Sequence, residues 1–433
     1  MIVRSTERTL TMSTKKELTI QVPVDQLKVG LYVDVGLSWM QNPFLFRRFR
    51  IKSTQEIKVI QDIVKGNISV YPGRSIVGVA PDAAEDAAAK DDMKPGSYEQ
   101  ALRVQKEKHL NEARRYRDQR QALMRLYRET SQKIKAFTGG LTREPANAIR
   151  DADGIVGDML DNFEQKGHVL MNLINLPESV YTPYAHSLNV MVLSLSLART
   201  HGLTGGSLRQ VALGALLHDV GLIQVPPKIT KSTTALSPAE QKVYETHPTI
   251  GGKLVRQIGV IDERVIDIIE MHHEMLDGSG YPGGIDEKKI SLAVRIVSIA
   301  NSYDNLCNPR ESEKSLTPKQ AMAILYSRYP GRLDQVLLEN FVKTMGIYPP
   351  GTVVQLSDDS VALVVSVDTE NLLKPVVLIY NPDIPKDEAF LMDLADRNDL
   401  TIEDALKPSQ YPPEMYEYLG MTHHVGYFYS VDE

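Results

Sequence analysis

The feature that most constrains this fold is a run from Ser97 to Phe137 that contains neither glycine nor proline. Most of its residues are charged or polar helix formers, so the run predicts one long helix over residues 97–140, about 60 Å long at 1.5 Å per residue. A helix of this length separates an N-terminal part of the chain from a C-terminal part. Its apolar positions do not hold a clean heptad: Leu102, Leu110, Ala113, Leu123, Leu126 and Ile134. A helix that forms a homodimer and a spacer helix that packs on its own domain are therefore equally good interpretations.

Composition narrows the class of protein. The chain has 433 residues, of which 42% are hydrophobic and 24% charged, as in a soluble globular protein of two or three domains. The formal net charge of -6 provides no positive field for duplex nucleic acid or an anionic membrane. A phosphate-bearing ligand must therefore be held by a local site.

The N-terminal residues and the cysteine content indicate the compartment. Cys307 is the single cysteine, which excludes an internal disulfide and a cysteine-rich zinc module. The first residues lack the apolar stretch of a signal peptide, and no segment has the ~18 uncharged apolar residues of a membrane helix. We expect a cytoplasmic protein without a membrane span.

The remaining segments predict a mainly α-helical protein with two smaller parts. Residues 18–79 alternate short β-like runs with one helical stretch, which predicts a small α+β domain. Residues 80–96 have the composition of a disordered linker. Apolar residues recur at helical spacing over residues 141–348, which predicts a helical domain, and residues 349–433 read as a short β-rich appendage.

One segment of the N-terminal domain, NPFLFRRFRI, is both aromatic and basic. A ligand-binding surface is one interpretation. A strand with one buried face is the more common structure for such a pattern, and we favour it.

The chemistry concentrates in six residues of the helical region: His186, His218, Asp219, His247, His272 and His273. Imidazole and carboxylate together suit iron, manganese, zinc and related ions, and no thiolate competes. His218 and Asp219 end an apolar helical segment, where buried charge is costly unless it is paired or coordinated. The other five histidines read as ordinary core or surface residues.

The local motifs are specific when taken in order. YAHSLNV, ALLHDVG, ETHPTIGGKLV, HHEMLDGSGYP and VRIVSIANSYDNL resemble the HD-GYP family from Pro177 to Tyr329. Residues 18–79 are similar to the N-terminal domain of unassigned function that often precedes such a domain. The resemblance implies an HD-type helical bundle. It also implies a metal-dependent phosphodiesterase that opens the bacterial second messenger cyclic di-GMP to linear pGpG, in some members on to GMP.

The resemblance also assigns residues to roles. Asp219 would bridge two divalent ions, iron or manganese, and with His218 carry catalysis. The implied metal ligands are His186, His218, Asp219, His247, His272, His273 and Asn301. Glu274 and Asp277 would orient the histidines. The implied substrate contacts are Lys228, Gly280, Tyr281 and Arg295.

Three positions depart from the family pattern. Asn301 stands where the family has an aspartate ligand. Leu222 stands where the family has a lysine that contacts phosphate, so Lys228 or Lys231 would have to take over that role. Thr182 replaces the glutamate of three-metal members, which favours two metals. A working phosphodiesterase is our preferred hypothesis. The alternatives are a degenerate domain that binds cyclic di-GMP or signalling proteins, and a hydrolase of another phosphorylated nucleotide.

Overall fold

The computed structural model describes residues 18–77, 95–170, 183–259, 261–311, 314–368, 370–397, 399–406 and 412–419. The chain forms two compact units, residues 1–115 with 381–391 and residues 116–380 with 392–433. Residues 80–94 of the predicted linker and Thr182 lie outside the described residues.

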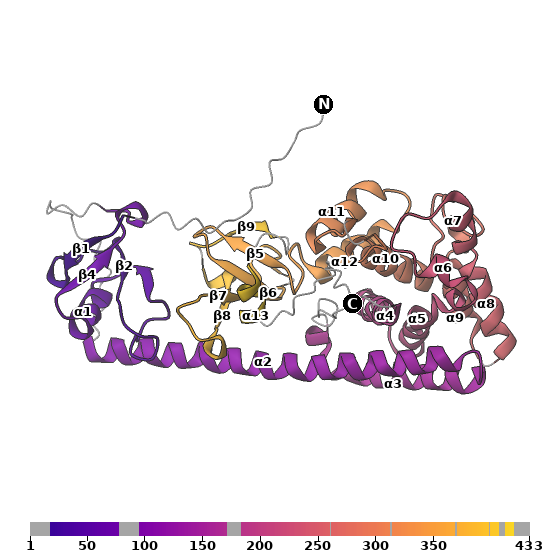
Figure 1. Cartoon of the computed structure of the whole chain (residues 1–433), viewed down its shortest axis with the longest axis horizontal. Helices are drawn as coiled ribbons and strands as arrows, with labels where there is room; N and C mark the ends of the chain where they lie inside the picture. The colour runs from indigo at the N-terminus through magenta and orange to yellow at the C-terminus, as the bar shows by residue number, and fades with distance from the viewer. Residues whose placement is uncertain are drawn as a thin grey trace, which may run out of the picture. The chain divides into compact units, whose positions relative to one another are not determined.

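The first unit contains a four-stranded antiparallel sheet and one short helix, as the α+β prediction requires (Figure 1). The sheet has the order β1-β4-β2-β3, with strands β1 (Ile20–Pro23), β2 (Tyr32–Asp34), β3 (Arg48–Arg50) and β4 (Asn67–Val70). Helix α1 (Thr54–Ile63) begins where the side chain of Ser53 accepts a hydrogen bond from the Glu56 amide. Its buried Val59 and Ile60 pack with the apolar residues of the strands to form a core.

The predicted long helix is present as α2 (Pro95–Gly140), a single helix of 46 residues. Its second half packs into the helical unit, where Leu123, Tyr127, Ile134 and Phe137 are buried in the same core as the helices that follow. The helical core therefore begins inside α2, before the expected boundary at residue 141. These apolar positions serve the chain's own core, which is the second of the two interpretations of this helix.

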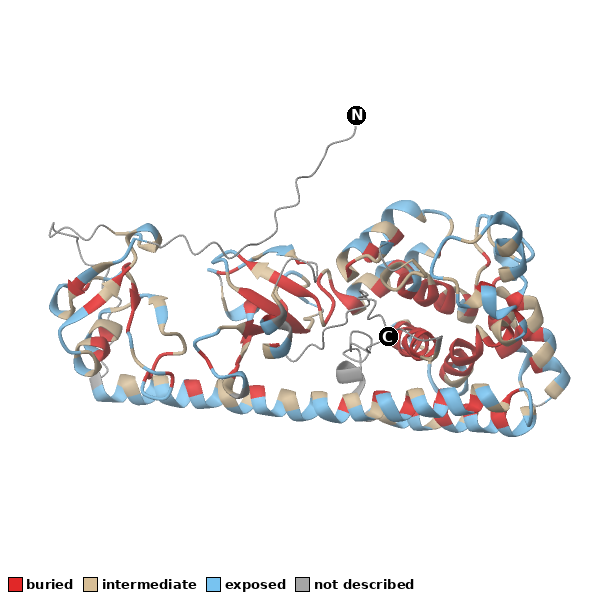
Figure 2. Cartoon of the chain, in the orientation of Figure 1, coloured by how far each residue is buried: buried red, intermediate tan, exposed pale blue. Residues whose placement is uncertain are grey.

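The second unit is an α-helical bundle, which confirms the predicted fold class. Helix α4 packs on α5 and α10, and α5 packs on α9. Figure 2 shows α4 as almost wholly buried, and α5 is buried over its second half. The bundle consists of α3 (Pro145–Leu170), α4 (Pro183–Thr200), α5 (Gly205–Leu217), α6 (Pro227–Thr230), α7 (Pro238–Tyr244), α8 (His247–Ile258), α9 (Glu263–Met271), α10 (Leu292–Cys307), α11 (Pro318–Arg328) and α12 (Gln335–Met345).

Residues after the bundle form the predicted β appendage. A five-stranded sheet has the order β8-β7-β6-β5-β9. Its strands are β5 (Val353–Leu356), β6 (Val361–Ser366), β7 (Val376–Tyr380), β8 (Leu391–Asp393) and β9 (Ile402–Ala405), and a short helix, α13 (Pro413–Tyr418), follows them. Among the helices that the structure describes, none has the length and apolar character needed to cross a membrane.

Candidate metal centre

Three of the predicted histidine ligands lie at helix ends, and the helix ends orient them. His218 follows α5, His247 follows α7 and opens α8, and His272 follows α9. The Nδ1 atom of each lies 2.7–2.9 Å from the carbonyl oxygen three residues earlier, those of Ala215, Tyr244 and Ile269. The last carbonyls of a helix lack a partner within the helix, so they are available to accept these bonds. Each Nδ1 therefore carries the proton, and each Nε2 presents a lone pair.

His186, in α4, is oriented by a side chain instead. Its Nδ1 lies 2.6 Å from a carboxylate oxygen of Asp304, which is fully buried in α10. The amide of Asn189 donates to the other oxygen of Asp304 at 2.9 Å. This pair also fixes the His186 proton on Nδ1, and it raises the pKa of His186 against the opposing effect of burial.

The Nε2 atoms converge in two pairs. Those of His186 and His218 lie 3.1 Å apart, and those of His247 and His272 lie 3.3 Å apart. Because each Nδ1 holds its proton, two lone pairs face each other in both pairs. Such an arrangement is repulsive unless a cation lies between or beside the nitrogens. The donor set therefore fits divalent metal ions.

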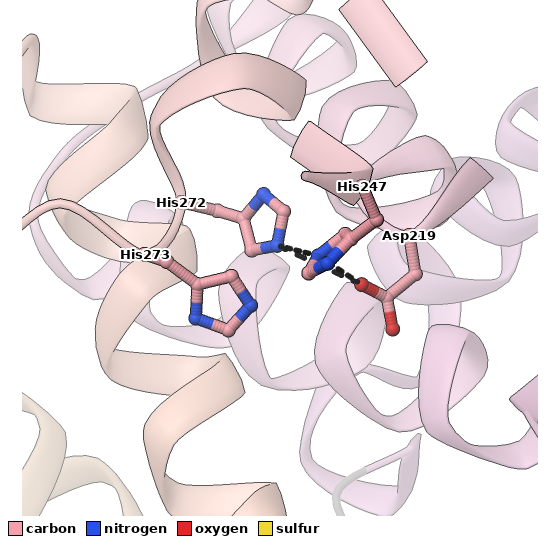
Figure 3. Close-up of side chains that lie close together, drawn as sticks. All are labelled: Asp219, His247, His272 and His273. Atoms are coloured by element: carbon pink, nitrogen blue, oxygen red, sulfur yellow. Dashed lines mark hydrogen bonds and ion pairs between the residues drawn. The ribbon is translucent and has the colours of Figure 1, made fainter. Parts of the chain in front are cut away.

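Asp219 joins the two pairs. Its Oδ1 lies 3.1 Å from Nε2 of His247 and 3.6 Å from that of His272. Its Oδ2 lies 3.6 Å from Nε2 of His218 and 3.7 Å from that of His186. The ligand atoms thus form two groups that share Asp219, one with His186 and His218 and the other with His247, His272 and His273. Figure 3 shows the second group.

Burial and charge keep these groups in the protonation states that metal binding requires. Burial lowers the pKa of His218 to about 3, and it lowers the pKa of His272 and His273 as well. Burial opposes ionisation of Asp219, but the adjacent His218 and the hydrogen bonds of His247 and His272 hold the pKa of Asp219 well below the ordinary value. His218, His272 and His273 are therefore neutral near neutral pH, beside an ionised Asp219 carboxylate.

The glycine-rich turn after α9 covers the second group. The Tyr281 ring stacks on His273 at a centroid distance of 4.4 Å and an interplanar angle of 20°. Gly280 is required by close approach, since a Cβ there would lie 2.4 Å from the carbonyl oxygen of His273. The turn thus places Tyr281 beside His273, one of the residues that could hold a metal ion.

The roles predicted for Glu274 and Asp277 need correction. The buried carboxylate of Glu274 accepts hydrogen bonds from the amides of Gly283 and Ile285, at 2.6 and 3.3 Å. Asp277 is exposed and accepts from Ser279. Both carboxylates hold the turn. Helix-end carbonyls orient His218, His247 and His272, and Asp304 orients His186.

The other predicted residues divide between the site and the surface. Asn301 is buried beside His186, and its side-chain oxygen accepts a hydrogen bond from Asn305 at 2.7 Å. Lys228 is 88% exposed and lies 3.5 Å from Glu240. Arg295 donates to Asp334 at 3.0 Å and to Glu287 at 3.4 Å, which are contacts that tie α10 to neighbouring elements. Neither cation contacts the metal ligands in the hydrogen bonds and ion pairs of the described chain.

Two further side chains at the site were missed. The guanidinium group of Arg310 lies 4.7 Å from the ring centroid of Tyr244, and it donates to the carbonyl of Ile229. The Tyr244 ring in turn lies 5.0 Å from the His247 ring. Arg310 therefore supplies a cation near the centre that neither Lys228 nor Arg295 supplies. It follows α10 in an irregular segment, where spacing gives no signal.

Comparison with protein families follows the same division of the chain. Residues 168–337 match the HD domain family, and residues 19–152 match a domain of unknown function, DUF3391. Two parts of the chain thus match these two domain families, which confirms the resemblance seen in its motifs. The DUF3391 match continues through α2 into α3, beyond the predicted boundary at residue 79.

Individual relatives carry related names. The chain is 26% identical over 362 residues to the cyclic di-GMP phosphodiesterase PA4108 of Pseudomonas aeruginosa, covering 83% of this chain and 84% of that protein. It is 34% identical over 144 residues to the cyclic di-GMP phosphodiesterase response regulator RpfG of Xanthomonas campestris pv. campestris, covering 32% of this chain and 36% of that protein. It is 30% identical over 194 residues to the 3'3'-cGAMP-specific phosphodiesterase 1 of Vibrio cholerae, covering 43% of this chain and 45% of that protein.

Among solved structures, the chain is similar to Bd1817, an HDG"Y"P protein from Bdellovibrio bacteriovorus. The TM-score is 0.45 at 18% sequence identity, and the match covers 75% of this chain and 98% of that chain.

Proposed function

We propose that this protein is a metal-dependent phosphodiesterase that hydrolyses cyclic di-GMP to linear pGpG in bacterial signalling in the cytoplasm. The observation that carries the proposal is the division of the ligand atoms into two groups that share Asp219. A carboxylate with one oxygen toward each group suits two ions, and two-metal sites are typical of phosphodiester hydrolysis. The name of the relative that matches most of this chain supports the choice of substrate.

The ions would be held by the residues that converge here. His186, His218 and Oδ2 of Asp219 would hold one ion, and His247, His272, His273 and Oδ1 of Asp219 the other. Imidazole nitrogens and a carboxylate, without thiolate, favour iron or manganese. When bound, two divalent ions polarise the phosphate and make a water molecule nucleophilic at neutral pH.

The protein's own groups would bind and orient the substrate. Tyr281 stacks on His273 and would contact a guanine or ribose at the entrance to the centre. Arg310, held over Tyr244, would contact a phosphate oxygen and take the place of the lysine that Leu222 replaces. Gly280 lets the backbone of the turn pass close to His273, so a side chain at this position would displace Tyr281.

One observation favours a second candidate, a domain that binds cyclic di-GMP without hydrolysing it. The side-chain oxygen of Asn301 already accepts a hydrogen bond from Asn305, and it brings no negative charge to the first group. A weaker first metal position would leave a site that binds the substrate but turns it over slowly.

The experiment that separates these candidates is turnover of cyclic di-GMP by protein loaded separately with Mn²⁺ and Fe²⁺ under reducing conditions. 3'3'-cGAMP is tested in parallel, because a relative is named for it. We expect pGpG from wild-type protein and from Asp161→Ala, which alters an exposed carboxylate on α3. Asp219→Ala and His218→Ala should lose both metal and turnover. Full turnover by Asp219→Ala would contradict the proposal. Metal-loaded wild type without product would favour the binding domain, which the affinity for cyclic di-GMP then tests.

A further inference from the structure

The end of α10 is fixed to a buried carboxylate of the metal centre. Asp304 is fully buried, and one of its carboxylate oxygens lies 2.6 Å from Nδ1 of His186. Asn308 is the residue that ends α10, and it bonds to Asp304 twice. Its backbone amide donates to the Asp304 carbonyl at 2.7 Å, and its side-chain amide donates to the Asp304 carboxylate at 3.1 Å. The same residue therefore orients His186 and holds the end of the helix.

A short and stiff link joins Asn308 to Arg310. Only Pro309 stands between them. The proline ring fixes the φ angle of Pro309 and also restricts the backbone of the residue before it. Such a link absorbs little movement, so a shift of Asn308 is passed on to Arg310. The backbone position of Arg310 therefore depends on the contact between Asn308 and Asp304.

The side chain of Arg310 is held by the other group of ligand residues. Its guanidinium group donates to the carbonyl of Ile229 and lies 4.7 Å from the ring centroid of Tyr244. The Tyr244 ring lies 5.0 Å from the His247 ring. His186 and His247 belong to different groups of ligand atoms. Arg310 is thus placed through its backbone by one group and through its side chain by the other.

Metal occupancy acts on the contact between His186 and Asp304. Without a cation, the Nε2 lone pairs of His186 and His218 face each other at 3.1 Å, and their repulsion pushes the His186 ring from this position. A cation at Nε2 removes the repulsion and makes the Nδ1–H group a stronger donor to Asp304. A carboxylate fixed in this way holds Asn308 in one position. The end of α10 is therefore better ordered when the centre is occupied.

We propose that Asn308 is a positioning residue that couples occupancy of the metal centre to the placement of Arg310, and thereby to the affinity for the substrate phosphate. The inference rests on the proposed function, in which Arg310 contacts a phosphate oxygen. It adds that metal binding orders the segment that holds the nucleotide. Because such coupling is reciprocal, the bound nucleotide strengthens metal binding by the same factor.

The test measures the binding of GMP, which carries a guanine and a phosphate but no phosphodiester bond. Calorimetry gives the GMP affinity of the full-length protein, once with Mn²⁺ and once with a chelator. With Mn²⁺, Asn308→Ala should weaken GMP binding about fivefold or more, since a hydrogen bond to a buried carboxylate is lost. With the chelator, the same substitution should change GMP affinity by less than about twofold. Mn²⁺ affinity without nucleotide should stay within about threefold of wild type, because Asn189 still donates to Asp304 at 2.9 Å.

A double-mutant cycle separates positioning of Arg310 from a general structural effect. In an Arg310→Ala background, Asn308→Ala should cause no further loss of GMP affinity. The matched control is Asn162→Ala, which removes another side-chain amide that bonds to its own helix, and it should bind GMP as wild type does. If Asn308→Ala does not fold, Asn308→Leu keeps the size of the side chain without its donor and should show the same loss.

Three results would overturn the inference. Asn308→Ala could bind GMP as tightly as wild type with Mn²⁺, or it could lose the same affinity with and without Mn²⁺. The loss could also persist in Arg310→Ala protein, so that it would not pass through Arg310. Metal-loaded wild type that does not bind GMP would count against the inference even if it hydrolyses cyclic di-GMP. Wild type that shows the expected GMP affinities without hydrolysing cyclic di-GMP would support the inference and contradict only the proposed function.

Discussion

Nδ1 of His186 and Oδ2 of Asp304 lie 2.6 Å apart, and this contact joins α4 to α10 at the metal centre. Asp304 lies one helical turn after Asn301, so the two side chains share a face of α10. Asn301 brings no charge to the ligand position. Asp304 brings a buried negative charge behind His186, which makes His186 a better electron donor to a metal. The negative charge that Asn301 does not supply is therefore present at Asp304, which contacts His186.

The first prediction concerns this contact. Asp304→Asn keeps the shape of the side chain but removes its charge, so we expect Mn²⁺ affinity to fall about 10- to 100-fold. Competition with a chelator of known affinity measures this change. Asp153→Asn is the control, because that carboxylate pairs with Arg209 at the surface. Equal Mn²⁺ affinity in wild type and Asp304→Asn would show that His186 needs no charged partner.

Most of the residues that converge here could be singled out because they follow a helix end, and helix ends can be read from the sequence: His218, Asp219, His247, His272 and His273. Asp304 was missed although a signal existed, since Asn301 and Asp304 are polar residues at i and i+3, which places them on one face of the helix. The partners of the histidines could not be predicted. They are mostly backbone carbonyls, such as that of Ala215, which have no signature in a sequence.

The substrate contacts were harder to predict for another reason. Arg295 was expected, from its position in a motif, to neutralise phosphate or to pair with an acid, and it pairs with Asp334, 39 residues away in sequence. Arg310 lies in a segment without periodicity, and only the folded chain brings it to Tyr244. Long-range pairing of charges is a property of the tertiary structure, which residue spacing does not encode.

The second prediction concerns the residue where the family has a lysine. Leu222 lies in the short helix η4 (Val220–Gln224) directly after Asp219, and its amide bonds to the Asp219 carbonyl at 2.9 Å. Leu222→Lys should strengthen binding of cyclic di-GMP about tenfold by adding one charge-assisted contact. Binding is measured in metal-free protein by calorimetry. Gln224→Lys adds the same charge at an exposed position of η4 and should have little effect. Equal affinities of the two lysine variants would mean that position 222 does not face the phosphate.

The third prediction tests a close approach of two backbone segments. A Cβ on Gly221 would lie 2.0 Å from the carbonyl oxygen of His247 and 2.6 Å from the amide nitrogen of Gly251. Gly221→Ala must therefore push α8 away from η4 and separate His247 from Asp219. We expect a loss of about 1–3 kcal/mol in stability, together with weaker metal binding. Gly206→Ala is the control, because a Cβ there has no neighbour within 4 Å. Mn²⁺ titrations measure the metal affinity of both variants, and thermal melts measure their stability. Mn²⁺ binding by Gly221→Ala as tight as that of Gly206→Ala would contradict the prediction.

The last prediction concerns pH and the metal-free protein. Burial lowers the folded-state pKa of His218, His272 and His273, so these residues stay neutral in the folded state while they gain protons in the unfolded state near pH 6.5. Their contribution to stability is present above pH 6.5 and is lost as the pH falls toward the folded-state values. His186 has a raised pKa and acts in the opposite direction.

Three of these shifts lower stability as the pH falls and one raises it, so the free energy of unfolding should fall by roughly 1–3 kcal/mol between pH 7.5 and pH 5.5. Native-state hydrogen exchange of the α5 amides, in the presence of a chelator, reports this change within the helical unit. In His218→Gln one titrating group is removed, so the change should be smaller by about 1 kcal/mol. A stability that is unchanged or higher at pH 5.5 in the wild type would mean that these histidines accept protons in the folded protein. The two groups of ligands would then be held together by protons when metal is absent.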